Sequence, residues 1–336
     1  MKNKIIILGI FLSFILLPLS YLYNPLLSML SLKKVDDFPL YQMKIYGDYG
    51  FDDFLKSGMD SSDISISNLP HNSTNFACTV FAALGEKQNP KLGRNFDWHT
   101  HPALILFSDP PDGYASVSMV DISYLGYDID DQKIPLIERK NLLEAVYMPF
   151  DGMNEVGLGV GMNAVSEMSG SYNPQKITLS SLNIMRLILD HAKTVEEAIA
   201  LIEQYNIEPQ SEPPLHYLVA DSSGDAAVIE FLNGEMKIVR SEQPWLISTN
   251  FIMANSNPDS YKSKCNRFRI AADELEALQG SATQKQAQEI LYTTAQSNTI
   301  WSSLYDLKSG EILFYMSHNF DTPYHFQLEM RNSPRE

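Results

Sequence analysis

The order of strand-like and helix-like segments constrains the fold of this chain more than any other feature of its sequence. Between residues 78 and 165, short runs rich in β-branched and aromatic residues alternate with Gly, Pro and Asn, which is typical of antiparallel hairpins. Residues 182–202 place apolar side chains three or four positions apart, which predicts two amphipathic helices. A second group of strands, two further helices and a last hairpin are expected at residues 215–251, 264–278, 283–296 and 299–316. We therefore predict an α+β fold in which two antiparallel sheets pack face to face between outer helices.

One region of the first group combines a strand with a turn. Residues 144–150 (EAVYMPF) are rich in apolar and aromatic residues and are predicted to form a strand. Residues 151–156 (DGMNEV) contain Gly, Asp and Asn, so we expect a turn-rich connection to the strand-like run 157–165. Residues 78–336 contain no linker-like or repeated segment and are predicted to form one domain.

The N-terminal residues differ in composition from the rest of the chain. Lys2 and Lys4 precede an apolar run, and no charged residue occurs from Ile5 to Leu32, which is long enough to span a bilayer. We expect residues 1–32 to be a signal peptide or a signal-anchor, with residues 5–32 as a possible membrane anchor. The protein is therefore predicted to be exported, and to be periplasmic, extracellular or anchored with its domain facing outside. The acidic, turn-rich residues 33–77 are interpreted as a prosegment or spacer.

The charge of the chain excludes some classes of partner. Its net charge of −16 argues against a nucleic-acid-binding protein, because such proteins need basic surface to replace the counterions around phosphates. The same negative charge disfavours electrostatic docking on anionic lipid. We therefore expect a small-molecule ligand and no nucleic acid; the oligomeric state stays open.

Cofactor and metal motifs are weak in this sequence. His99 and His101 could both face one side of a strand, but no third ligand lies near them in the sequence. The segment GLGVG at 157–161 lacks the spacing of a nucleotide-binding loop, and the GxSxG pattern of many serine hydrolases does not occur. We predict that the protein uses no metal and no cofactor.

Two cysteines, Cys78 and Cys265, leave two interpretations open: a single disulfide bond or free thiols. A thiol must lose its proton before it can attack, which requires a nearby cation or base. His216 could serve as that base, but the residues around Cys78 do not resemble a papain-like site. The α-amine of Cys78 itself could also serve, since an α-amine titrates near pH ~8. This amine exists only if the chain is cut before Cys78.

The segments CT (78–79), GRNFDW, DGMNEVGLGVGMN, ADSSGDAAVIE, TN and NRF resemble, in order and spacing, those of an N-terminal-nucleophile hydrolase family. It is the choloylglycine hydrolase or linear amide C–N hydrolase family, which includes bile salt hydrolases, penicillin V acylases, acid ceramidase-like amidases and penicillin acyltransferases. The resemblance covers most of residues 78–320. It implies a four-layer αββα sandwich and an amidase domain at 78–336.

The resemblance also implies a role for each matching residue. Cys78 would be the nucleophile, freed by self-cleavage between Ala77 and Cys78. The other matching positions are Arg94 and Asp97 beside the thiol and amine, Asn163 and Asn250 as oxyanion donors, and Arg267 as a further active-site arginine.

The implied activity is hydrolysis of a linear amide bond in a small N-acyl compound, a carbon–nitrogen bond other than a peptide bond. Trp98, Tyr114 and Tyr124 are expected to line an apolar acyl pocket. Two alternatives stay open: an acyltransferase on the same scaffold, and a membrane-anchored binding protein with a degenerate site.

Overall fold

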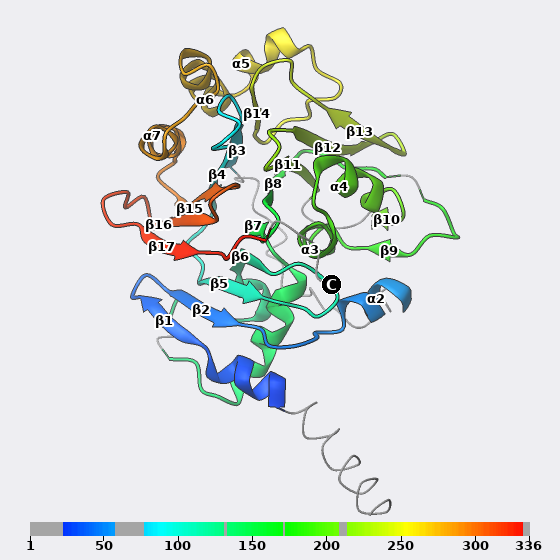
Figure 1. Cartoon of the computed structure of the whole chain (residues 1–336), viewed down its shortest axis with the longest axis vertical. Helices are drawn as coiled ribbons and strands as arrows, with labels where there is room; N and C mark the ends of the chain where they lie inside the picture. Colours follow the sequence, from blue (N-terminus) through cyan, green and yellow to red (C-terminus); the bar gives the residue numbers. More distant parts are fainter. Residues whose placement is uncertain (1–22, 58–76, 131–132, 171, 208–213, 332–336) are drawn as a thin grey trace, which may run out of the picture.

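Two β-sheets that pack face to face form the centre of the molecule (Figure 1). The structure is a computed structural model and describes residues 23–57, 77–130, 133–170, 172–207 and 214–331. Within these residues the larger sheet has nine strands, in the spatial order β1 (Lys33–Asp36), β2 (Leu40–Lys44), β5 (Ala103–Ser108), β6 (Ser116–Asp121), β7 (Asp151–Asn154), β8 (Leu158–Ala164), β11 (Leu215–Asp221), β12 (Ala226–Leu232) and β13 (Glu235–Val239).

The second sheet has six strands within the described residues, all paired antiparallel. Their order is β14 (Trp245–Ser248), β3 (Ala77–Ala83), β4 (Lys91–Asp97), β15 (Thr299–Asp306), β16 (Glu311–Met316) and β17 (Tyr324–Gln327). Strands β3 and β4 contact β8 of the larger sheet, and β15 contacts β7. The nearly continuous burial of these strands follows from their position between the two sheets.

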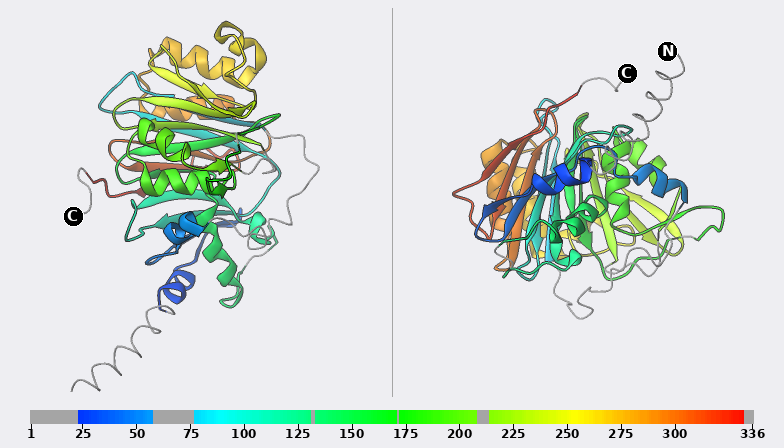
Figure 2. Two further views of the ribbon diagram at one scale, coloured as in Figure 1. Left: turned by 90° about the vertical axis from the view of Figure 1, so that its right-hand side faces the viewer. Right: turned by 90° about the horizontal axis from the view of Figure 1, so that it is seen from below.

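Helices cover the outer face of each sheet, which completes four layers (Figure 2). On the larger sheet lie α3 (Asn183–His191) and α4 (Val195–Ile202), and on the smaller sheet lie α6 (Asn266–Ala277) and α7 (Gln284–Thr294). Shorter elements are α2 (Phe51–Ser57), α5 (Tyr261–Lys264), the parallel pair β9 (Thr178–Leu179) and β10 (Asn206–Ile207), and 3-10 helices at Ile122–Leu125, Glu138–Tyr147 and Pro258–Ser260. The predicted αββα sandwich is confirmed.

Two predicted elements are wrong. Residues 144–147 belong to a 3-10 helix, not a strand, and the buried side chains Leu142, Ala145 and Val146 have the three-and-four spacing of a helix. The expected turn after them is partly a strand, β7. Its Gly152 permits close packing rather than a turn, since a Cβ there would lie 2.7 Å from the carbonyl oxygen of Val117.

Within the predicted prosegment or spacer, strands β1 and β2 belong to the larger sheet. Strand β2 pairs in parallel with β5, so the larger sheet departs at this edge from the predicted antiparallel pairing (Figure 1, blue strands). The division between residues 77 and 78 stays a prediction. Residues 1–22, which hold most of the predicted signal or anchor, lie outside the described residues. In the part of the chain that the structure describes, no helix combines the length and apolar character that crossing a membrane requires.

Gly159 of β8 provides a test of the packing between the sheets. A Cβ at this position would lie 2.8 Å from Leu307 Cδ2 and 2.9 Å from Leu92 Cδ2. We expect Gly159→Ala to lower the free energy of unfolding by about 1–3 kcal/mol, as measured by denaturant titration, because the leucines must shift in a filled interface. The control is Gly170→Ala, where the nearest atoms lie 4.0 Å away. Equal stability of the two variants would contradict this explanation.

Candidate active site

The candidate nucleophile lies at the start of a central strand. Cys78 is the second residue of β3, pairs with Phe96 of β4, and is only 2% exposed. Its backbone N–H donates to Asn250 Oδ1 at 2.7 Å. Cys78 and Cys265 are both free thiols, so the structure contains no disulfide bond between them.

Arg94 and Asp97 approach Cys78 from opposite faces of β4. Arg94 points into the space between the sheets, where its Nη1 lies 2.6 Å from Asp151 Oδ2 and its Nε donates to the Met162 carbonyl. Asn95 bonds to helix α7 on the outer face, and alternation along the strand places Asp97 on that outer face too. Both residues are fully buried. The two side chains therefore flank the beginning of β3 rather than forming a pair with each other.

Arg267, near the start of α6, links Cys78 to Asn250. Its Nη1 donates to the Cys78 carbonyl and, at 3.2 Å, to Thr79 Oγ1, and its Nη2 donates to Asn250 Oδ1 at 3.0 Å. Asn250 Oδ1 thus accepts from Arg267 and from the Cys78 N–H, while Asn250 Nδ2 donates to the Ala164 carbonyl at 2.8 Å. Cys78, Asn250 and Arg267 are thus in direct contact, while the roles that the resemblance implies for them stay predictions.

Asn163 lies beside this group, on β8. Gly161, two residues before it, faces Val80 of β3, so alternation directs the Asn163 side chain toward the same sheet. Asn163 Nδ2 lies 2.7 Å from Ser248 Oγ, two residues before Asn250. The structure thus brings Asn163 near the other predicted site residues; its role as an oxyanion donor stays a prediction, as does that of Asn250.

Burial controls the protonation of the two acids at the site. Burial raises the pKa of the Cys78 thiol, and the Asp97 carboxylate adds to this effect, whereas Arg94, Arg267 and the Asp97 backbone N–H oppose it. Burial also raises the pKa of Asp97 to about 6, against the opposing effects of the Thr299 hydroxyl and the two arginines. The uncut chain therefore holds a protonated thiol, and the two arginines do not suffice to ionise it.

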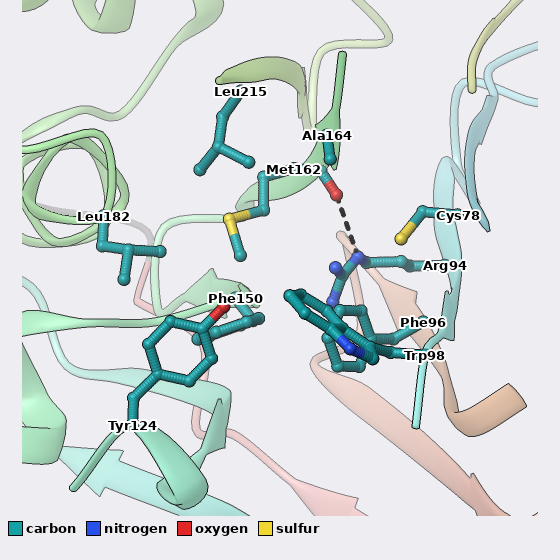
Figure 3. Close-up of a pocket in the computed structure, with 10 residues that line it drawn as sticks. All are labelled: Cys78, Arg94, Phe96, Trp98, Tyr124, Phe150, Met162, Ala164, Leu182 and Leu215. Atoms are coloured by element: carbon teal, nitrogen blue, oxygen red, sulfur yellow. Dashed lines mark hydrogen bonds between the residues drawn. The ribbon is translucent and has the colours of Figure 1, made fainter. Parts of the chain in front are cut away.

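A narrow apolar pocket opens beside Cys78 (Figure 3). It is lined by Cys78, Arg94, Phe96, Trp98, Tyr124, Phe150, Met162, Ala164, Leu182 and Leu215. Trp98 and Tyr124 thus contribute to it as expected, while Tyr114 lies elsewhere, where its N–H donates to the Asp190 carbonyl. The free volume of the pocket is about 10 Å³, which a single water molecule fills.

Two residues that hold the site together, Asp151 and Thr299, are not among those predicted from the sequence. Asp151, which we assigned to a turn, is fully buried and carries the charge that faces Arg94. Thr299 donates its hydroxyl proton to Asp97 Oδ1 from the neighbouring strand β15. Neither residue has a local signal in the sequence, because the Arg94 partner of Asp151 and the Asp97 partner of Thr299 lie on another strand.

The side chain of His101, near Trp98, has a structural partner. His101 Nδ1 lies 2.8 Å from Asp121 Oδ2, at the start of a 3-10 helix. Among the described residues, no three or more His, Cys, Asp or Glu side chains are grouped so that they could hold a metal ion.

Comparison with known proteins identifies the family. Residues 78–288 match the family model of the linear amide C-N hydrolases, choloylglycine hydrolase family. The chain belongs to this family. It is therefore a hydrolase that acts on linear carbon–nitrogen amide bonds, and the match begins at Cys78.

Individual relatives of this hydrolase are distant. An uncharacterised protein of Paramecium bursaria Chlorella virus 1 is 27% identical over 188 residues, which cover 52% of this chain and 67% of the viral protein. A penicillin V acylase of Pectobacterium atrosepticum is 30% identical over 113 residues, or 30% of this chain and 29% of the acylase. A mutant conjugated bile acid hydrolase of Clostridium perfringens has a similar fold, with a TM-score of 0.57, 17% identity, and coverage of 76% of this chain and 93% of that chain.

Asp97 should make stability depend on pH. Because its pKa is about 6 in the folded chain and near 3.8 when unfolded, the folded chain binds the proton more tightly, so stability is lost as pH rises from about 4 to 6. In an uncut Cys78→Ala background, Asp97→Asn should remove this loss and raise the free energy of unfolding at pH 7 by up to about 3 kcal/mol. Urea unfolding between pH 4 and 7 measures the difference, and parallel pH curves for the two proteins would contradict it.

Proposed function

We propose that this hydrolase is a cysteine N-terminal-nucleophile enzyme. It cuts its own chain between Ala77 and Cys78, and Cys78 then attacks the linear amide bond of a small N-acyl compound. No metal or cofactor takes part in either reaction.

Two observations carry the proposal: an acceptor that bonds to the Cys78 nitrogen, and a buried acceptor on the neighbouring strand β4 that has no partner in the described part of the chain. Asn250 Oδ1 accepts from this nitrogen at 2.7 Å. The second oxygen of Asp97, Oδ2, is buried and has no hydrogen-bond partner among the described residues. A buried carboxylate oxygen without a partner is costly, and an α-amine at Cys78 would supply the missing donor. The site thus suits a free amine better than it suits the uncut peptide.

Self-cleavage is an N-to-S acyl shift. The Cys78 sulfur attacks the carbonyl carbon of Ala77, and the peptide C–N bond breaks. The sulfur's proton is transferred to the departing nitrogen, which becomes the α-amine. Water hydrolyses the resulting thioester, which leaves a carboxylate on Ala77 and restores the thiol.

Turnover repeats this chemistry on a substrate. The α-amine takes the proton of the thiol, and the sulfur attacks the amide carbonyl of the substrate. Asn163 and Asn250 each donate one NH₂ proton to the oxyanion and stabilise it, while Asp97 orients the amine. The ammonium then protonates the leaving amine, and water releases the acyl group from the thioester with the α-amine as base.

The pocket supports an apolar acyl group as the part of the substrate that is bound. Its lining is aromatic and aliphatic apart from Cys78 and Arg94. The pocket is narrow in the chain before cleavage, and the α-amine that serves as base in this mechanism does not exist until the cut is made. The uncut chain is then an inactive precursor.

We also propose that the enzyme works outside the cytoplasm. The support is the uncharged apolar run from Ile5 to Leu32 after two lysines. Fractionation of cells that express the full chain tests this assignment.

Mass spectrometry of the purified protein tests the nucleophile. We expect a product whose N-terminal sequence is Cys-Thr-Val-Phe, because the cut occurs before Cys78. Cys78→Ala should give only chains uncut at this position and no amide turnover. The matched control is Cys265→Ala, which removes the other free thiol and should cut and turn over like the wild type.

An active wild-type enzyme that is uncut at this bond would contradict the mechanism. Substrates are tested as a panel of N-acyl amides with different acyl chains, with and without an added acceptor amine. Free acid as the main product in the presence of acceptor supports hydrolysis, whereas a new amide indicates an acyltransferase.

The segment before the cut should stay bound after cleavage. Strand β2 forms a ladder with β5, Tyr49 donates its hydroxyl to Asp190 Oδ2 at 2.6 Å, and Arg139 donates to the Met29 carbonyl at 2.9 Å. We expect the peptide containing residues 23–57 to co-elute with the larger chain in size-exclusion chromatography and to separate from it in urea. A cut enzyme from which this peptide elutes separately without urea would contradict the prediction.

A further inference from the structure

A buried pair of charged side chains lies next to the candidate site without taking part in the proposed reaction. His216 of β11 and Glu230 of β12 are both at most 1% exposed. His216 Nδ1 lies 2.8 Å from Glu230 Oε1, and His216 Nε2 lies 2.7 Å from the Thr249 carbonyl oxygen. Both ring nitrogens are thus occupied, so His216 is not the base for Cys78 that the sequence allowed.

The neighbours of His216 determine its protonation. The Thr249 carbonyl can only accept, so Nε2 carries a proton. The two oxygens of Glu230 accept the N–H groups of Met253 at 2.9 Å and Ala254 at 2.8 Å, which favours the ionised carboxylate. Burial alone would raise the pKa of Glu230, but His216 and the two backbone donors hold it below its ordinary value. Nδ1 therefore also donates, so both ring nitrogens of His216 act as hydrogen-bond donors.

The ion pair fixes the segment that carries Asn250. Residues 249–254 follow β14, and their Thr249 carbonyl and the Met253 and Ala254 N–H groups all bond to the pair. Asn250, within this segment, accepts from the Cys78 N–H. The position of Asn250 relative to Cys78 is thus tied to β11 and β12 of the opposite sheet.

The same ring also faces Asn163, its cross-strand neighbour on β8. Asn163 Nδ2 lies 3.5 Å from His216 Nε2 and 2.7 Å from Ser248 Oγ, while Oδ1 is buried without a partner among the described residues. A nitrogen that carries a proton cannot accept from an NH₂ group. Turning the amide by half a turn lets its oxygen accept from Ser248 and frees the NH₂ group, and the oxygen then also lies 3.5 Å from Nε2 as a weaker second acceptor of the N–H that bonds mainly to the Thr249 carbonyl.

We propose that His216 and Glu230 are positioning residues that hold both oxyanion asparagines in their working orientation. The pair places Asn250 through the 249–254 segment, and the Nε2 N–H, through its weaker second contact, favours the orientation of the Asn163 amide in which the NH₂ is available to a substrate oxyanion. This inference rests on the proposed function, because it assigns the pair a purpose in that reaction.

Kinetic measurements on conservative variants test the positioning role of His216 and Glu230. His216→Gln should lower kcat for amide hydrolysis about 100-fold, since small displacements of positioned groups have effects of this size, while KM changes less than about threefold. Glu230→Gln should lower kcat about 10-fold, because the imidazole keeps its bond to Thr249. The matched control is Lys91→Met, which removes the buried Lys91–Asp306 ion pair on other strands and should leave kcat within about twofold. A kcat for His216→Gln no lower than that of Lys91→Met would overturn the proposal.

Two measurements on the uncut Cys78→Ala chain do not depend on activity. Nitrogen-15 NMR of labelled histidine should show one imidazole ring whose two N–H protons are both protected from exchange at neutral pH. The signals of this ring should be absent in His216→Gln. Hydrogen exchange of residues 249–254 should accelerate in His216→Gln and Glu230→Gln but not in Lys91→Met. A neutral His216, or unchanged exchange in the variants, overturns the inference. A wild-type chain that neither cuts nor hydrolyses any amide contradicts the proposed function instead.

Discussion

The arrangement of both sheets and of the candidate site depends on one buried ion pair, Arg94–Asp151. Arg94 belongs to β4 of the six-stranded sheet and Asp151 to β7 of the nine-stranded sheet, and their charged atoms lie 2.6 Å apart with both side chains almost fully buried. Such a pair is tolerated only when its remaining polar atoms are also bonded. Asp151 meets this condition through Trp301, Ser303 and Tyr305, three side chains of β15. The pair thus joins three strands from two sheets at one point.

This use of Arg94 has a chemical consequence for Cys78. An arginine beside a thiol favours the thiolate, but Arg94 shares its charge with Asp151 and donates a further bond to the Met162 carbonyl. Burial outweighs what remains of its effect, so the thiol stays protonated in the uncut chain. The base that deprotonates the thiol must therefore be another group. The outer face of β4 has room for such a base beside Asp97. In the proposed mechanism, the α-amine at the start of β3 is that base.

The sequence could predict the features of this structure that depend on residues close together in the chain. Hairpins and amphipathic helices follow from residue periodicity, and the predicted sandwich was correct. The site residues came from the resemblance and not from spacing, because Arg94 and Asp97 lie on opposite faces of their strand. Asp151 and Glu230 could not be found in this way, since each is defined by partners from distant strands. The parallel pairing of β2 with β5 is equally non-local, because nothing in an acidic, turn-rich segment indicates which edge it will join.

The placement of Cys78 within its strand also explains why a cut there need not disturb the fold. Ala77 is the first residue of β3, so the bond to be broken lies at the end of the ladder, and the pairs from Thr79 to Ala83 with β4 do not involve it. The Cys78 carbonyl is held by Arg267 and its nitrogen by Asn250, which are contacts from outside the β3–β4 ladder. Cleavage would therefore replace an amide N–H by an amine in a setting that side chains already define. In the proposed mechanism the β3–β4 ladder therefore stays in place after the cut, and the contacts of Asn250 and Arg267 with Cys78 can persist.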